Sequence, residues 1–147
     1  MVPVDPLPVA VVRLDAELPL PAYAHPGDAG LDLHAREDAS VPAGGRALVP
    51  TGIAMAIPPG HGGFVLPRSG LALHHGVTVA NAPGLVDAAY RGELKVILLN
   101  TGQADYTVHR GDRIAQLVVQ RVAEVTWQVV DELDGDDRGG GFGHSGR

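Results

Sequence analysis

The chain has 147 residues, 45% of them hydrophobic, and 17 acidic against 11 basic residues give a net charge of −6. This length fits one domain with a core of its own, and no apolar run approaches the roughly 18 residues of a membrane-spanning helix. The absence of cysteine excludes disulfides, a thiolate nucleophile and a cysteine-based zinc site. With Lys95 as the only lysine, there is no basic stripe for general nucleic-acid binding. The N-terminus has prolines and no basic segment, so we expect a cytoplasmic protein without a signal peptide.

Glycines and prolines divide the chain into segments that are too short for most helices. The segments expected to form strands are residues 31–41, 47–51, 63–66 and 93–101. The last of these is apolar on both faces, which fits a strand buried on two sides. Residues 112–134 contain no glycine or proline and are rich in valine, so strands are expected there too. With a short helix possible only at residues 69–75, the pattern predicts an all-β sandwich, jelly roll or barrel.

Residues 67–70 (PRSG) place a guanidinium, a hydroxyl and a glycine amide at consecutive positions. Arginine provides charge and a fork of donors, and glycine lets the backbone approach an anion closely. The segment is therefore a candidate anion-binding site, with a plain turn as the alternative.

Residues 81–91 (NAPGLVDAAYR) are predicted to form a hairpin-like loop between two apolar strands. Asn81 and the free backbone groups near the Pro83-Gly84 turn can contact a planar polar edge. Asp87 stands between apolar neighbours, so it is a candidate general base, with a turn-stabilising carboxylate as the alternative. Tyr90 can pack its ring against a sugar or a base, or belong to the core.

Residues 28–35 (DAGLDLHA) alternate apolar and polar side chains. This period of two predicts a half-buried strand. Asp32 then points away from the leucines on either side of it, and on spacing alone nothing further follows.

The C-terminal segment, residues 131–147, is acidic in its first half and rich in glycine in its second. Such a segment cannot bury enough apolar surface to hold itself in place, so we expect a flexible tail after a domain of residues 1–130. Arg138 and Phe142 stand alone within it. Either the tail is simply disordered, or it orders over a ligand with the ring stacked and the guanidinium on an anion.

Taken together, five segments resemble the motifs of the trimeric dUTP pyrophosphatase (dUTPase) family, in the family's order and over most of the chain. The segments are residues 29–33 (AGLDL), 67–72 (PRSGLA), 81–92 (NAPGLVDAAYRG), 111–117 (GDRIAQL) and 140–146 (GGFGHSG). The resemblance implies a distorted jelly-roll barrel and a three-fold homotrimer with shared active sites. It also implies hydrolysis of dUTP to dUMP and pyrophosphate with Mg²⁺, which keeps uracil out of DNA and supplies dUMP for dTMP synthesis.

The resemblance also implies roles for the residues of the hairpin-like loop. Asp87 would orient and deprotonate the water that attacks the α-phosphorus. Asn81 and the backbone around Leu85 and Val86 would contact uracil, in a slot too tight for the methyl group of thymine. Tyr90 would pack under the deoxyribose and exclude a 2′-hydroxyl.

Further substrate contacts implied by the resemblance are Arg68, Ser69, Gly70, Lys95, Gln116, Arg138, Phe142, Gly143 and Ser145. The residues of the PRSG segment and Gln116 would hold the phosphates, while Lys95 would make a backbone contact. Phe142 would cap the uracil and Arg138 would clamp the γ-phosphate as the tail closes. Mg²⁺ would be held mainly by the substrate phosphates, with Asp32 touching its water shell. Mg²⁺ suits such a site because it keeps several waters and needs few protein carboxylates.

The tail departs from the family pattern in its spacing. The family's tail arginine usually stands five residues before the aromatic ring, whereas Arg138 stands four before Phe142 and Asp137 occupies the usual position. The neighbouring glycines offer a way to absorb this shift. A milder departure is His144-Ser145, where many members carry Ser-Thr.

Two alternative functions fit parts of the pattern. A dCTP deaminase of the same fold would need a catalytic glutamate near C4 of the pyrimidine, and the strand after the hairpin offers only Glu93, at its start. A non-catalytic nucleotide-binding β-trimer would have no obvious use for Asp87. Hydrolysis of dUTP is therefore the predicted activity.

Overall fold

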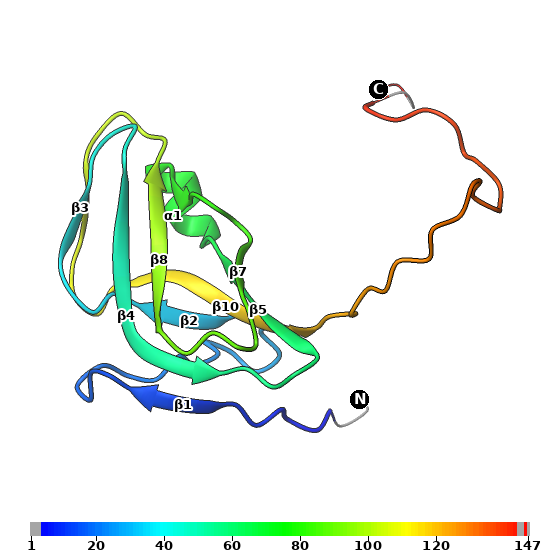
Figure 1. Ribbon diagram of the computed structural model, residues 1–147. Helices are drawn as coiled ribbons and strands as arrows, with labels where there is room; N and C mark the ends of the chain where they lie inside the picture. Colours follow the sequence, from blue (N-terminus) through cyan, green and yellow to red (C-terminus); the bar gives the residue numbers. More distant parts are fainter. Residues whose placement is uncertain (1–3, 144–145, 147) are drawn as a thin grey trace.

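The computed structural model describes residues 4–143 and 146 (Figure 1). Within this part, the elements follow in the order β1 (Ala10–Arg13), β2 (Leu31–His34), β3 (Ala39–Val41), β4 (Arg46–Ala56), β5 (His61–Leu66), α1 (Ser69–His75), β6 (Val77–Val79), β7 (Gly84–Val86), β8 (Glu93–Asn100), β9 (Tyr106–Val108) and β10 (Arg113–Arg121). The prediction of an all-β fold is confirmed.

The strands form two four-stranded antiparallel sheets and one two-stranded ribbon. The sheets have the orders β1-β4-β8-β6 and β2-β10-β5-β7, and the ribbon is β3-β9. All three contribute to one buried hydrophobic cluster, which includes Val41 of the ribbon, Leu98 of the first sheet and Leu117 of the second. Because antiparallel sheets bury one face each, this shared core holds the two sheets in a fixed relation.

The helix predicted at residues 69–75 and the strand predicted at residues 93–101 both exist, as α1 and β8, but the strand is buried differently from our expectation. Helix α1 ends at Gly76, whose φ of 67° lies in the left-handed region that favours glycine. In β8, Leu94, Val96 and Leu98 are buried whereas Lys95 is exposed. The prediction of burial on both faces was therefore wrong, because β8 lies in an antiparallel sheet with one face toward the core.

Two further segments are shorter than predicted. Residues 31–41 form two strands, β2 and β3, which pair in different sheets. Of residues 112–134, only β10 is a strand. It ends at Arg121, opposite His61, the first residue of its partner β5. In the described part of the chain, the residues after Arg121 have no strand to pair with, although they remain rich in valine.

The chain after β10 leaves the body and runs outward, as the orange and red segment of Figure 1 shows. Residues 122–143 contain neither helix nor strand, and nearly all of them are exposed. Val125, Trp127 and Val129 are among these exposed side chains, Trp127 with 87% of its surface accessible. The predicted boundary between domain and tail at residues 130 and 131 stays a prediction. In the described part of the chain, no helix has the length and apolar character needed to cross a membrane.

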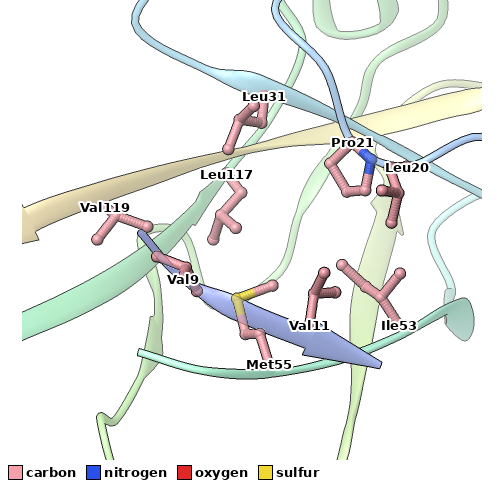
Figure 2. Close-up of a pocket in the computed structure, with 9 residues that line it drawn as sticks. All are labelled: Val9, Val11, Leu20, Pro21, Leu31, Ile53, Met55, Leu117 and Val119. Carbon is pink, nitrogen blue, oxygen red and sulfur yellow. The ribbon is translucent and has the colours of Figure 1, made fainter. Parts of the chain in front are cut away.

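An apolar pocket of about 170 Å³ lies between the edge strand β1 and the second sheet (Figure 2). Its walls are Val9, Val11, Leu20, Pro21, Leu31, Ile53, Met55, Leu117 and Val119. None of these nine lining side chains carries a charge or a hydrogen-bonding group, so the pocket offers only apolar contact.

Hydrogen bonds of Arg110 connect three loops, which follow β1, follow β2 and precede β10. Arg110, before β10, donates hydrogen bonds to the carboxylate of Asp15, after β1. It also donates to the backbone carbonyl of Arg36, after β2. The hydrogen bond from Arg110 lowers the pKa of Asp15 from 3.8 to about 2.

This pKa predicts how the stability of the chain depends on pH. The Asp15 carboxylate contributes stability that is complete above its unfolded pKa of 3.8 and is lost as the pH falls toward about 2. Arg110→Gln should therefore lower the urea midpoint near neutral pH, and the difference from the wild type should close as Asp15 becomes protonated. Urea unfolding at a series of pH values measures this. Arg121→Gln, which removes an exposed arginine at the end of β10, is the control; an equal loss in both variants at every pH would contradict the prediction.

Candidate active site

The predicted hairpin residues line two adjoining hollows between β7 and β8. One hollow, of about 70 Å³, includes Asn81, Leu85, Val86 and Lys95 in its walls. The other, of about 290 Å³, shares Leu85, Val86 and Lys95 with the first and adds Asp87 and Tyr90. Since the two share lining residues, they form one groove, and the structure brings together the five hairpin residues that the sequence singled out, together with Lys95 of β8.

The local fold explains how this groove forms. Strand β7 pairs with β5, with Gly84 opposite Val65 and Val86 opposite Gly63, so the loop is not a simple hairpin but contributes a strand to the second sheet. Gly84 and Val86 are buried, and Leu85 between them is 63% exposed toward the other side. The alternation of a strand therefore turns Leu85 outward.

A tight turn follows β7 and carries the candidate base. The amide of Tyr90 donates to the carbonyl of Asp87 at 3.0 Å. The guanidinium of Arg91 donates to the carbonyl of Ala88 and, at 3.0 Å, to that of Tyr90. Asp87 itself is exposed, although its sequence neighbours are apolar. Asp87 thus stands at the groove in a turn in which the carbonyls of Asp87, Ala88 and Tyr90 accept hydrogen bonds.

Other residues line the groove that the sequence did not indicate. They are Leu48, Val65, Val79, Leu94, Val96 and Ile97, whereas Gly84, which also lines the groove, belongs to the Pro83-Gly84 turn that the sequence did indicate. Most of them are apolar residues of β4, β5, β6 and β8, so they give the groove an apolar floor. For the lining residues of β8, alternation within the strand was the available sequence signal. The lining residues of β4 and β5 could not be found in this way, because they reach the groove only through the strand register.

A second group of polar residues lies where β10 runs between β2 and β5. Gln116 is opposite Asp32 on one side and Leu66 on the other, and its amide donates to the carbonyl of Pro67 at 2.9 Å. A Cβ at Gly30 would collide with the side chain of Gln116. Glycine at this position therefore leaves room for the glutamine to reach the PRSG segment.

Two arginines complete this group, which we call the arginine cluster: Asp32, Arg68, Arg113 and Gln116. The Asp32 carboxylate lies 3.9 Å from Nε of Arg68 and 3.5 Å from a guanidinium nitrogen of Arg113. Arg68 also donates to the carbonyl of Arg113 at 3.0 Å. Arg68 directly precedes α1, which begins with Ser69. The cluster thus places two cations beside the serine and glycine predicted to bind an anion.

His34 follows Asp32 on the same face of β2 and was not singled out by the sequence. Its Nδ1 is buried and has no hydrogen-bond partner among the described residues. Burial lowers the pKa of His34 below 6.5, although the charge of Asp32 acts in the opposite direction. The imidazole is therefore neutral near neutral pH, and the positive charge of this region comes from the arginines.

The remaining predicted residues are not brought to the groove. Arg138, Phe142 and Gly143 belong to the outward-running segment (Figure 1), and the Phe142 ring is fully exposed. Ser145 lies outside the described residues. In the part of the chain that the structure describes, the residues lining the groove do not include those of the arginine cluster.

The fold and the groove define a small all-β protein with a polar surface site over an apolar floor. A sequence model of the dUTPase family matches residues 16–146. The chain is 59% identical over 140 residues to the deoxyuridine 5′-triphosphate nucleotidohydrolase of Thermobifida fusca, covering 94% of this chain and 78% of that protein. It is 55% identical over 141 residues to the enzyme of the same name from Syntrophotalea carbinolica, covering 94% and 96%. The chain therefore belongs to the dUTPase family.

Solved structures agree on the fold. A dUTPase variant of Staphylococcus bacteriophage 80alpha, determined with dUpNHpp, superimposes with a TM-score of 0.88 at 24% identity, covering 95% of this chain and 99% of that chain. A dUTPase variant of phage phi11 of S. aureus, described with a structural Mg(II) ion, gives a TM-score of 0.79 at 24% identity, covering 86% and 98%. At this identity the likeness concerns the fold alone.

Proposed function

We propose that this chain hydrolyses dUTP to dUMP and pyrophosphate. The observation that carries the proposal is the groove in which Asn81, Asp87 and Tyr90 meet over an apolar floor, in a chain that belongs to the dUTPase family. Relatives that share more than half of its residues are named for this reaction. A related phage enzyme was solved with the dUTP analogue dUpNHpp.

In this proposal the groove selects the base and the sugar. The hollow of about 70 Å³ is small, which suits a pyrimidine edge contacted by Asn81 and by the backbone at Leu85 and Val86. The methyl group of thymine would have to displace buried side chains of the floor, which are costly to move. Tyr90 lines the adjoining hollow, and in this proposal its ring packs against the deoxyribose.

Asp87 is the proposed general base. Its carboxylate takes a proton from water while the water oxygen forms a bond to the α-phosphorus. The bond from the α-phosphorus to the bridging oxygen breaks, and pyrophosphate leaves with the electron pair. Reactions of this kind depend mainly on positioning and on neutralising charge. In the proposal Arg68 and Gln116 of the arginine cluster, with Ser69 and Gly70 at the start of α1, hold the phosphates.

The residues of this chain fit a Mg²⁺ ion that binds together with the substrate, mainly through the substrate phosphates. Among the described residues, no group of three or more His, Cys, Asp or Glu side chains could hold a metal ion. Asp32 is already near two guanidinium groups, so it suits a contact to the water shell of a cation carried by the phosphates. When bound there, Mg²⁺ would neutralise phosphate charge.

The proposed working form is a homotrimer of distorted jelly-roll subunits with shared sites. Two observations support it. The groove and the arginine cluster do not share lining residues, so a second copy would complete the site. The exposed apolar side chains of residues 122–130 and the apolar pocket of Figure 2 are surfaces that an assembly would cover.

The contacts of Glu93 argue against the deaminase alternative. Its carboxylate accepts hydrogen bonds from Arg36 and from the amide of Gly52, both at 3.0 Å. A carboxylate held in this way by two donors is poorly suited to proton shuttling at a pyrimidine.

Substrate selectivity is the direct test of the proposed function. Pyrophosphate release should occur with dUTP and be at least tenfold slower with dTTP, dCTP and UTP, on the order expected for losing one well-fitted contact. EDTA should abolish the release because the phosphates then lack their cation. Equal release from all four nucleotides, or ammonia release from dCTP, would overturn the proposal.

Removing the proposed base separates binding from turnover. Asp87→Asn should reduce kcat by a factor of roughly 10²–10⁴ while dUTP still binds, because the amide keeps its shape but cannot accept the proton. Single-turnover kinetics and equilibrium dialysis measure the two effects. Asp5→Asn, which changes an exposed carboxylate far from the groove in sequence, should leave both unchanged. An unchanged kcat in Asp87→Asn would exclude the role.

The tail is proposed to close over the bound nucleotide through Arg138 and Phe142. A chain truncated after Asp137 should lose roughly tenfold or more in kcat/KM, because water exclusion and phosphate positioning are lost. Its molar mass by light scattering should equal that of the full chain. A drop in mass would mean that the tail holds the assembly together, and an unchanged rate would mean that it has no part in turnover.

A further inference from the structure

The pairing of β4 with β8 is interrupted beside the groove. The register runs from Arg46 opposite Leu99 to Pro50 opposite Lys95, and resumes only at Ala54 opposite Glu93. Two hydrogen bonds from β4 span the gap. The Thr51 hydroxyl donates to the carbonyl of Leu94, and the Gly52 amide donates to Oε1 of Glu93 at 3.0 Å. Interruptions of this kind redirect the neighbouring chain and occur often beside active sites.

The Glu93 carboxylate is the centre of this junction. Besides the Gly52 amide, it accepts a hydrogen bond from Nη1 of Arg36 at 3.0 Å, and only 17% of its side chain is exposed. The same guanidinium donates to the carbonyl of Leu14 at 3.0 Å and lies 3.7 Å from the carboxylate of Asp15. Charge-assisted bonds from two directions therefore fix the first residue of β8.

The backbone of this residue in turn holds Tyr90. The Tyr90 hydroxyl donates to the carbonyl of Glu93 at 2.8 Å. The ring also lies close against Gly92, where a Cβ would stand 2.6 Å from the hydroxyl oxygen and 2.8 Å from Cζ. The ring position is thus set by residues 92–93, and these are fixed by the Glu93 carboxylate.

We propose that Glu93, held by Arg36, is a positioning residue that fixes the Tyr90 ring and thereby sets the preference for 2′-deoxyribose over ribose. The inference rests on the proposed function, in which Tyr90 packs against the sugar. A ring can exclude a hydroxyl group only where it cannot recede. Here the phenol hydroxyl donates to the backbone carbonyl of Glu93, and the side chain of the same residue is bonded to Gly52 of β4 and to Arg36, so movement of the ring away from the groove would break this hydrogen bond.

The test is the ratio of kcat/KM for dUTP to kcat/KM for UTP, measured on the full chain with Mg²⁺. Glu93→Ala should lower this ratio on the order of tenfold, since small displacements of a positioned group carry penalties of this size or more. Glu93→Gln should keep the ratio, because the amide oxygen still accepts from Gly52 and Arg36. The ratio does not depend on how much of a preparation is folded, since both substrates use the same active molecules.

Two further single variants and one double variant test the route and guard against a misfolded Glu93→Ala protein. Arg36→Gln leaves the Gly52 bond in place and should lower the ratio by a smaller factor. Tyr90→Phe removes only the hydroxyl and should lower the ratio as Glu93→Ala does. In the double variant E93A/Y90F the two losses should not multiply, because both break the same connection. Arg121→Gln, which removes an exposed arginine at the end of β10, is the control and should keep the ratio.

The outcomes separate this inference from the proposed function. If the wild-type chain does not distinguish dUTP from UTP, the proposed function fails and the inference with it. If the wild type distinguishes them and Glu93→Ala lowers both kcat/KM values equally, Glu93 is only structural and the inference alone is overturned. Multiplying losses in the double variant would likewise overturn it, because Glu93 would then act by a route other than Tyr90.

Discussion

The antiparallel pairing of β8 with β4 is the constraint on which the candidate site depends. It carries Leu94 and Lys95 to the groove and sets Leu48 of β4 opposite Ile97, so that Leu48 lines the groove as well. Where the regular pairing of β4 with β8 is interrupted, Thr51 donates a hydrogen bond to Leu94 and Gly52 donates one to Glu93. The floor of the groove is therefore a regular sheet, and its wall is a turn anchored to the irregular part of the same sheet. A rigid floor beside a separately anchored wall suits selection by shape.

The net negative charge of the chain is unfavourable for binding a triphosphate, and the fold offsets it locally by placing two arginines together. A chain with a net charge of −6 repels a triphosphate at long range. Arg68 and Arg113 lie on either side of Asp32, so one carboxylate orders two guanidinium groups before any ligand arrives. Their charge is concentrated at one place and is not supplemented by His34, whose pKa is lowered by burial. The proposed need for a cation bound to the substrate follows from this limited supply of positive charge.

The sequence predicted those features that depend on neighbouring residues. Helix α1 and strand β8 were predicted from glycine and proline spacing and, for β8, from a run that is apolar on both faces. The hairpin residues that meet at the groove came from the motif of residues 81–92. Features that depend on register were missed. Leu48 reaches the groove only through the β4–β8 pairing, and the bond from Arg36 to Glu93 joins residues 57 positions apart. The end of β10 was also missed, because it is set by the length of β5 and not by the composition of β10.

The parts of the proposed site lie in different regions of the chain. Their positions indicate which steps of the proposed reaction a single subunit can support. In the proposal, base and sugar selection rest on the groove, where Asn81, Asp87 and Tyr90 are already assembled. Phosphate binding is assigned to the arginine cluster, which is built around β10, and closure is assigned to the tail, which runs outward from the end of β10 (Figure 1). In the proposed homotrimer the parts that recognise the nucleoside are preformed, whereas the parts that drive phosphoryl chemistry come together only in the assembly. Turnover would then require assembly and closure, while discrimination between dUTP and UTP would already be encoded in the rigid junction of β4, β8 and Tyr90.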